Sequence, residues 1–243
     1  MSITAILSAL AEEQQGLLEL LQQPQKSSHA GRDFWQGRLH GHPVVLALSR
    51  IGKVAAATTS TALIERFSVE RIIFTGVAGG LGDGVQMGDV VVATEFVQHD
   101  LDASPIFPRY EVPLYGRSRF PCDAALTARL LQASRAGLES LALPAKTLLH
   151  HGLMASGDRF VSGMQESRNL RMALKQGGHE VLAVEMEGAA VAQVCFDYGL
   201  PFAAVRTISD RADDTAHVDF PVFVKDVASL YAQAIVRRLL EAL

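Results

Sequence analysis

Val184-Glu185-Met186-Glu187-Gly188-Ala189-Ala190 is the most informative segment of the chain, because an apolar run enters a helix there with two carboxylates at the junction. Residues 181–184 are all apolar, which is typical of a strand buried in a parallel sheet. The alanine-rich residues that follow favour a helix. Open α/β sheets bind ligands at the carboxyl ends of their strands, so Glu185 and Glu187 are candidate ligand contacts. A helix dipole that attracts acids would explain the same pattern without a ligand.

Strand-like and helix-like runs alternate along the rest of the chain, which predicts one α/β domain over residues 1–243 with a mixed sheet and helices on both faces. The predicted strands 33–39 and 43–48 form a hairpin that turns at His40-Gly41-His42. Strands are predicted at 3–7, 33–39, 43–48, 71–74, 89–97, 147–153, 180–184 and 202–207, and helices at 11–23, 53–67, 124–136, 166–176, 188–198 and 220–243.

Composition narrows the class of protein. The 243 residues are 49% hydrophobic and 20% charged, with a net charge of -4, so a full core is available and a basic nucleic-acid surface is not expected. No apolar run is long enough to span a membrane, and the first seven residues suit a strand better than a signal peptide, which predicts a cytoplasmic protein. The two distant cysteines, and histidines without ligand spacing, predict no metal and no cofactor.

Four loops that follow predicted strands carry unusual residues, and they could meet Glu185 and Glu187 at one edge of the sheet. They are residues 8–13, 76–80, 156–161 and 206–210. In Gly76-Val77-Ala78-Gly79-Gly80 the glycines let the backbone approach a ligand, so Val77, Ala78 and Gly79 are candidate contacts. A plain turn explains these glycines equally well, since the loop matches neither a dinucleotide fingerprint nor a P-loop.

Glu13 and Asp210 are the candidate catalytic acids, each in a loop after a strand at opposite ends of the chain. Cleavage of a glycosidic bond needs a base to activate water and an acid to protonate the leaving group. Two carboxylates can fill both roles if their surroundings separate their pKa values. The alternatives are a solvated first-turn acid at Glu13, beside Glu12, and a helix cap or Asx-turn at Asp210.

Residues 99–121 break the alternating pattern. Four prolines are interleaved with four aromatic residues in this segment, which excludes a regular interior element. A loop folded over its own core is one explanation. We favour a loop that reaches a subunit partner or covers a site.

Seven motifs together make the chain resemble the bacterial 5′-methylthioadenosine/S-adenosylhomocysteine nucleosidases, within the nucleoside phosphorylase superfamily. They occur in the same order over nearly the whole chain. Glu-Met-Glu alone marks only the superfamily, and the whole set, with the early glutamate, points to its hydrolase branch. The motifs are Ala9-Leu10-Ala11-Glu12-Glu13, residues 51–57, Thr75-Gly76-Val77-Ala78-Gly79-Gly80-Leu81, Gly88-Asp89-Val90-Val91-Val92, Ser156-Gly157-Asp158-Arg159-Phe160-Val161, residues 184–190 and Arg206-Thr207-Ile208-Ser209-Asp210.

The resemblance implies a three-layer α/β/α sandwich with a central mixed sheet, a homodimer, and release of adenine from its 5′-substituted nucleosides by hydrolysis. It implies that Glu13 is the general base that activates water. Asp210 would protonate or hydrogen-bond N7 of adenine, supported by Ser209. Arg206 would lie near the ribose and the attacking water.

The resemblance also implies the residues that bind the nucleoside. Glu187, with Met186, would hold the ribose hydroxyls. Phe160 would stack on adenine, while the Val161 backbone would read the Watson–Crick edge of the base.

The 5′ group would occupy a pocket lined by Leu10 and Ile51, and we expect Phe107 and Pro113, in residues 99–121, to complete this pocket across the dimer. Because this segment departs from the commonest form of the family, methylthio, homocysteinyl and futalosine-type 5′ groups stay open.

Two other positions depart from the family pattern. Val77 stands where many members have a serine that helps hold water, and Arg50 stands where many have glycine. Arg50 could be a solvated side chain or a cation near the 5′ end of the substrate. Phosphorolysis by a purine nucleoside phosphorylase, hydrolysis of aminofutalosine, and non-catalytic nucleoside binding remain as alternative functions.

Overall fold

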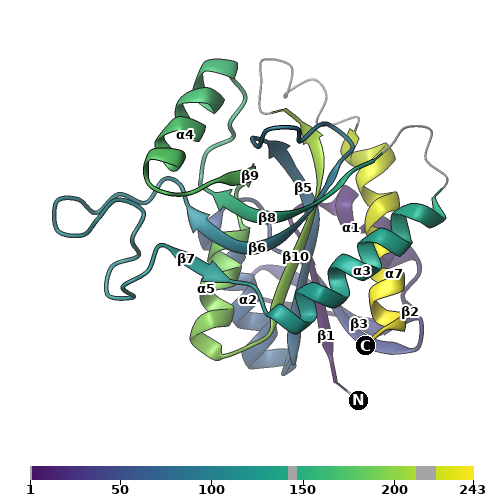
Figure 1. Ribbon diagram of the computed structural model, residues 1–243. Helices are drawn as coiled ribbons and strands as arrows, with labels where there is room; N and C mark the ends of the chain where they lie inside the picture. The colour runs from purple at the N-terminus through teal and green to yellow at the C-terminus, as the bar shows by residue number, and fades with distance from the viewer. Residues whose placement is uncertain (1, 142–146, 212–222) are drawn as a thin grey trace.

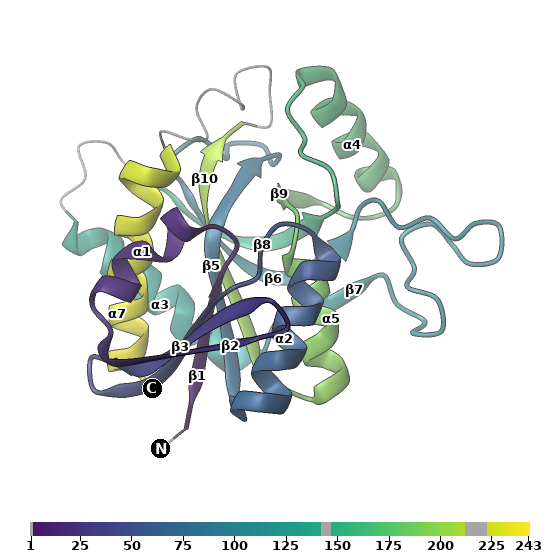
Figure 2. The same ribbon diagram turned by 180° about the vertical axis from the view of Figure 1, so that it is seen from behind.

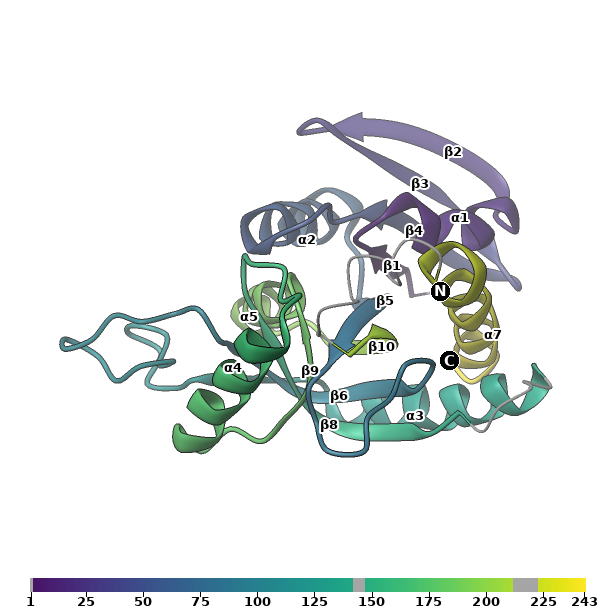
Figure 3. The same cartoon turned by 90° about the horizontal axis from the view of Figure 1, so that it is seen from above.

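The structure is a computed structural model of residues 1–243, and it describes residues 2–141, 147–211 and 223–243 (Figure 1). Helices cover both faces of one mixed sheet, as the sequence predicts (Figures 2 and 3). The strands are β1 (Thr4–Ser8), β2 (Gln22–His29), β3 (Arg32–Leu39), β4 (His42–Leu48), β5 (Arg71–Gly80), β6 (Val90–Gln98), β7 (Arg119–Pro121), β8 (Leu149–Ser156), β9 (Val181–Glu185) and β10 (Phe202–Asp210).

Five of the helices form two groups on the two faces of the sheet, while α4 packs against β9. Helices α2 and α5 pack together on one face, and α1, α3 and α7 pack together on the other (Figure 2). They are α1 (Ala11–Glu19), α2 (Lys53–Phe67), α3 (Ala124–Ser140), α4 (Met164–Gln176), α5 (Gly188–Tyr198), the π-helical turn η1 (Val224–Ala228) and α7 (Ser229–Glu241).

Part of the sheet closes on itself. The strand order is β10-β6-β8-β9-β5-β1-β4-β3-β2, and β10 pairs with β5 as well as with β6. Strands β5, β9, β8, β6 and β10 therefore form a ring, from which β1, β4, β3 and β2 extend. The pairs β1–β5 and β5–β10 are parallel, so their carboxyl ends lie at the same edge.

The alternation of side chains along β5 builds two cores. Ile72 and Phe74 face the core under α2 and α5, and Ile73 faces the core under α3 and α7. Successive residues of a strand point to opposite faces, so three neighbouring apolar residues serve both layers. This is why the strand reads as a continuous apolar run in the sequence.

The structure corrects the predicted helix at 11–23. Helix α1 ends at Glu19, and the chain enters β2 at Gln22. Strand β2 is an edge strand with almost every side chain exposed, so it shows no apolar alternation. Pro24 lies where the β2–β3 register is irregular, which is a position an edge strand tolerates.

Two later elements also differ from the predicted bounds. Strand β10 runs through Ser209 and Asp210, which the sequence placed in a loop. The predicted helix 220–243 is replaced by η1 from Val224 and then α7 to Glu241, while residues 220–222 lie outside the described residues.

Residues 100–118 form an arm that projects from the body between β6 and β7 (Figure 1). At its base, Tyr110 N donates to Leu101 O at 3.0 Å, and within it Val112 bridges to Arg117. Ile106 and Leu114 in this arm are 82% and 91% exposed. The irregular segment predicted at 99–121 is therefore present, apart from the short strand β7.

No helix in the described ranges combines the length and apolar character needed to cross a bilayer.

Candidate functional site

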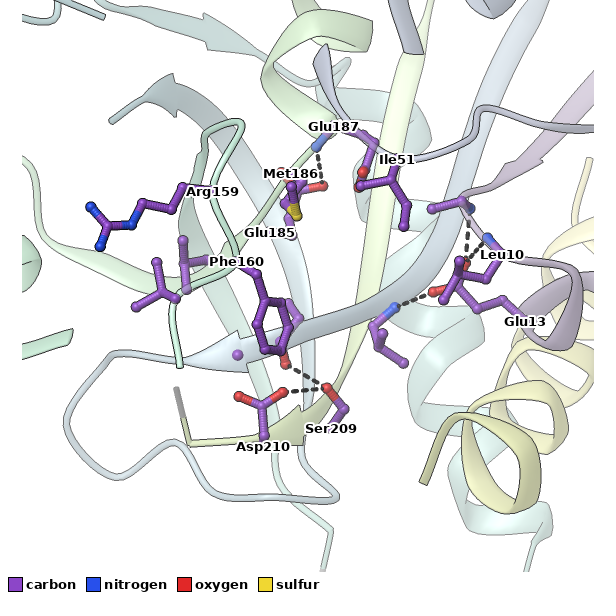
Figure 4. A pocket seen from close by; sticks show the side chains of 16 residues that line it. Leu10, Glu13, Ile51, Arg159, Phe160, Glu185, Met186, Glu187, Ser209 and Asp210 are labelled. Atoms are coloured by element: carbon purple, nitrogen blue, oxygen red, sulfur yellow. Dashed lines mark hydrogen bonds between the residues drawn. The ribbon is translucent and has the colours of Figure 1, made fainter. Parts of the chain in front are cut away.

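A cavity of about 300 Å³ opens at the carboxyl ends of β1, β5, β9 and β10 (Figure 4). The loops after β4 and β8 complete its wall, so six segments that are distant in sequence meet there. In Figure 4 Glu13 lies at one end, and Asp210 lies with Phe160 at the other. The lining residues are Ala9, Leu10, Glu13, Ile51, Val77, Ala78, Gly79, Arg159, Phe160, Val161, Val184, Glu185, Met186, Glu187, Ser209 and Asp210.

Glu13 is held by three backbone N–H groups. Its Oε2 accepts from Ala9 N at 2.8 Å and Leu10 N at 2.9 Å, and its Oε1 accepts from Val77 N at 3.0 Å. The Leu10 bond is one half of a capping box, because Glu13 is the third residue of α1. Burial raises the pKa of Glu13 above its ordinary value, although these donors and the charge of Arg206 partly oppose the rise.

Gly76 leaves the space that Glu13 occupies. A Cβ added at Gly76 would lie 2.9 Å from Glu13 Oε1 and 3.2 Å from its Cδ. Residues 76–80, which the sequence placed in a loop, are the end of strand β5, and glycine is needed at position 76 for a close approach to a carboxylate of the same chain.

A β-bulge lets two consecutive residues of β10, Ser209 and Asp210, both line the cavity. Ile208 pairs with Ala78 and Asp210 pairs with Gly79, so β10 has one residue more than β5 in this interval. Such a bulge redirects side chains, and both residues line the cavity. Ser209 Oγ donates to Asp210 Oδ2 at 2.7 Å, and Asp210 is 3% exposed.

Glu187 is attached to the turn before α2. Gly52 N donates to Glu187 Oε1 at 2.8 Å. Burial and the neighbouring charge of Glu185 raise the pKa of Glu187 to about 8, although the Gly52 bond and Arg206 act in the opposite direction. The carboxyl group is therefore costly to ionise in the cavity, and a ligand that donates hydrogen bonds to it would lower that cost.

Glu185, the other carboxylate of the Glu-Met-Glu motif, has its bonds directed into the protein. Its Oε2 accepts from Arg206 Nη2 and from Gly188 N, both at 2.8 Å. Ser156 Oγ donates to its Oε1. The two acids of the motif thus differ: Glu185 joins β9 to β8 and β10, and Glu187 faces the cavity.

Arg206 lies behind the cavity wall rather than in it. Its side chain is 1% exposed and stacks on Phe74, with the guanidinium carbon 3.9 Å from the ring centroid. Nη1 donates to Phe74 O at 3.1 Å. The ion pair with Glu185 holds the guanidinium inward, and the expected place of Arg206 near the ribose and the attacking water stays a prediction.

Arg50 also points away from the cavity. Its guanidinium donates to Gly31 O in the turn between β2 and β3, and it lines a separate hollow between α1 and β3. Phe107 and Pro113 are half-buried in the arm and do not line the cavity of their own chain. They were expected in a partner's site, and that expectation stays a prediction.

The cavity thus gathers thirteen of the predicted residues, Glu185 among them, and three others. The three are Ala9, Arg159 and Val184. Each adjoins a predicted residue in the sequence, so proximity along the chain was the signal for them. In the described ranges, histidine, cysteine and acidic side chains form no group of three or more that could hold a metal ion.

Comparisons with a family model, with related sequences and with solved structures all indicate the same family. The phosphorylase superfamily model matches residues 4–241. A 5′-methylthioadenosine/S-adenosylhomocysteine nucleosidase from Bacillus thuringiensis (strain Al Hakam) is 37% identical over 240 residues, which cover 98% of each chain.

Two solved structures agree with this result. The corresponding nucleosidase from Neisseria meningitidis, in complex with methylthio-immucillin-A, has a TM-score of 0.88 and 34% identity over 100% of both chains. Futalosine hydrolase of Helicobacter pylori has a TM-score of 0.87 and 32% identity, covering 100% of this chain and 98% of the other. The chain belongs to the phosphorylase superfamily, in the nucleosidase branch that includes these enzymes.

Proposed function

We propose that this chain hydrolyses the N-glycosidic bond of 5′-substituted adenine nucleosides, 5′-methylthioadenosine and S-adenosylhomocysteine, and releases adenine. One observation carries the proposal: Glu13 and Asp210, from opposite ends of the chain, line a single cavity large enough for a nucleoside. Water attacks C1′ as the bond to N9 breaks. No cofactor enters these steps.

Glu13 is the general base in this proposal. It takes a proton from the attacking water, so that a hydroxyl adds to the sugar carbon. A base works best when its pKa is near the working pH, and burial raises the pKa of Glu13 in that direction. The three backbone donors fix the carboxylate, which reduces the cost of orienting it during the reaction.

Asp210 acts at the base end. It donates a proton or a hydrogen bond to N7, so that the purine leaves without a full negative charge. The Ser209 hydroxyl bond to Oδ2 orients the carboxyl group. Phe160 is 44% exposed at the same end and offers a flat face for adenine, beside the Val161 backbone.

Glu187 and Met186 hold the ribose. The hydroxyl groups of the sugar donate to the Glu187 carboxylate, which has a single hydrogen bond, from Gly52 N, within the described part of the chain. The sugar gains positive charge as the glycosidic bond breaks. A carboxylate beside it stabilises that charge more strongly than the neutral substrate.

The charge of the cavity supports hydrolysis over phosphorolysis. Four acidic side chains line it, and its one lining cation, Arg159, is paired with Glu166 at 2.7 Å, so the wall offers a phosphate dianion no uncommitted positive charge in the described residues. The Arg206 guanidinium is paired with Glu185 behind the wall, and Arg50 faces another hollow. Val77 offers no hydroxyl donor. Both candidate catalytic acids are present, which argues against a protein that only binds nucleosides.

We propose further that the chain is a homodimer in which the arm of one protomer completes the 5′ pocket of its partner. Leu10 and Ile51 provide the apolar part of the pocket from the same chain. Phe107 and Pro113 would come from the partner's arm. The exposed Ile106 and Leu114 support this assignment, because such side chains gain from being covered.

Aminofutalosine is the second candidate substrate, favoured by the likeness to futalosine hydrolase. It differs from methylthioadenosine at the 5′ end, so the same acids would serve both.

The test is incubation with methylthioadenosine, adenosylhomocysteine, aminofutalosine and inosine, with and without phosphate, while free base is measured. We expect adenine from methylthioadenosine without phosphate. A rate that depends strictly on phosphate would establish the phosphorylase alternative instead.

A further inference from the structure

Asp100, the first residue of the arm, connects two loops that carry parts of the cavity. Its Oδ1 accepts from Lys53 Nζ at 2.5 Å, and its Oδ2 accepts from Asp158 N at 2.9 Å. Lys53 begins α2, and Asp158 lies two residues before Phe160. One carboxylate therefore joins the start of α2 to the loop that carries Phe160 and Val161.

The Asp158 side chain closes the connection. Its Oδ1 accepts from Lys53 N at 2.7 Å, which satisfies one of the free N–H groups at the beginning of α2. Gly52, which precedes Lys53, has φ of 96°, and a Cβ there would lie 3.1 Å from Asp158 Oδ1. Glycine is thus needed at this position for both its backbone angle and the space it leaves.

The same turn holds Glu187. Gly52 N donates to Glu187 Oε1, and the next N–H along the chain, that of Lys53, donates to Asp158. A shift of Asp158 would move this turn and with it the donor to Glu187. The loop that carries Phe160 and the carboxylate proposed to bind ribose are therefore mechanically connected through two consecutive N–H groups.

We propose that Asp100 is a positioning residue that holds Glu187 and the Phe160 loop in one geometry and links both to the arm. This inference rests on the proposed function, because it assigns the ribose and the base to those two parts of the cavity. The arm is proposed to reach a partner's site. A change in its position would then alter the geometry of the nucleoside site in its own protomer.

The contacts are more than an isolated surface ion pair. The side chains of Lys53 and Asp100 are 16% and 30% exposed, and Lys53 Nζ also donates to Gln98 Oε1 at 3.0 Å. Burial acts to raise the pKa of Asp100, but the hydrogen bonds from Lys53 and Asp158, together with the charge of Lys53, hold that pKa below its ordinary value. Several partners acting together restrict a carboxylate more than one exposed pair does.

Replacement of Asp100 by alanine and by asparagine tests the inference, with Asp102→Ala and Asp102→Asn as matched controls. Asp102 lies in the same arm, and its contacts, to Ser104 and Arg109, stay within the arm. Asparagine at 100 keeps an acceptor for Asp158 N but loses the charge that pairs with Lys53. Adenine release from methylthioadenosine gives kcat and KM, and calorimetry gives the affinity for adenine and, if the chain does not hydrolyse it, for methylthioadenosine.

We expect Asp100→Ala to lower kcat/KM by about tenfold to a hundredfold, because small displacements of positioned groups cost that much. The kcat/KM of Asp100→Asn should lie between those of the unaltered chain and Asp100→Ala. Both Asp102 variants should have the kcat/KM of the unaltered chain. Lys53→Met should resemble Asp100→Ala, and the double variant should be no worse than the stronger single change. If these variants melt near the temperature of the unaltered chain, their loss of activity is due to misplaced groups and not to unfolding.

Equal kcat/KM in the Asp100 and Asp102 variants would overturn the inference, as would a double variant in which the two losses multiply. Should Asp100→Ala fail to fold, Asp100→Asn and Lys53→Met still provide the comparison. Absence of adenine release by the unaltered chain would overturn the proposed function instead. In that case methylthioadenosine affinity decides this inference alone: weaker binding by the Asp100 variants supports it, and unchanged binding refutes it.

Discussion

Arg206 and Glu185 form a buried ion pair, in which Nη2 lies 2.8 Å from Oε2 and the two side chains are 1% and 2% exposed. Removing one partner leaves an unpaired charge in the interior. We expect Arg206→Met to cost about 3–5 kcal/mol in the free energy of unfolding. The double variant Arg206→Met with Glu185→Leu should be less destabilised than the sum of the single changes. Urea denaturation measures both, and strictly additive losses would contradict the pairing.

Glu13→Gln should lower kcat by ~10²–10⁴-fold, because the amide cannot take a proton from water at neutral pH. Glu12→Gln is the control, since Glu12 is exposed and directly adjacent in α1. Adenine release and circular dichroism are measured on both variants. Undiminished release by Glu13→Gln in a folded protein would count against its role as the base.

Gly76→Ala should impair the reaction through Glu13. The added methyl group would lie 2.9 Å from Glu13 Oε1 and displace the carboxylate from its three donors. We expect about a tenfold or greater loss of kcat, since misplaced groups are poor catalysts. In a Glu13→Gln background the same change should cost little further activity. A loss of equal size in both backgrounds would show that Gly76 acts independently of Glu13.

The motif at residues 184–190 correctly indicated the strand and the helix, because local apolar periodicity determines these elements. It also contains the two acids that line the cavity, Glu185 and Glu187. It could not separate Glu185 from Glu187, since the Arg206 partner comes from another strand. The closure of the sheet through β10 and β5 was also beyond the sequence pattern. Pairings between strands so distant along the chain leave no local signal.

Strand β2 was missed for a different reason. Its polar side chains are exposed on both faces, so the period of two that marks a half-buried strand is absent. Ser209 and Asp210 were placed in a loop because the bulge disturbs the alternation at the end of β10. The inward position of Arg206 needed the tertiary structure as well.

Asp210→Asn should reduce turnover by orders of magnitude while the fold is retained, because an amide cannot supply the proton to N7. Ser209→Ala should have a smaller effect, about tenfold, since it removes only the 2.7 Å bond that orients Asp210. Single-turnover adenine release measures both. An Asp210→Asn variant as active as the unaltered chain would exclude proton donation by this residue.

Ionisation of Glu187 should make stability fall as the pH rises. Burial and the charge of Glu185 raise the pKa of Glu187 from 4.5 to about 8, so the folded chain binds a proton that the unfolded chain has released. Between these pH values the folded state is favoured by protons, and that contribution is lost as the pH increases through about 8. Melting temperatures of the empty protein at several pH values should therefore decline over this range. Glu187→Gln should flatten the decline, and an unchanged slope in that variant would assign the effect to another group.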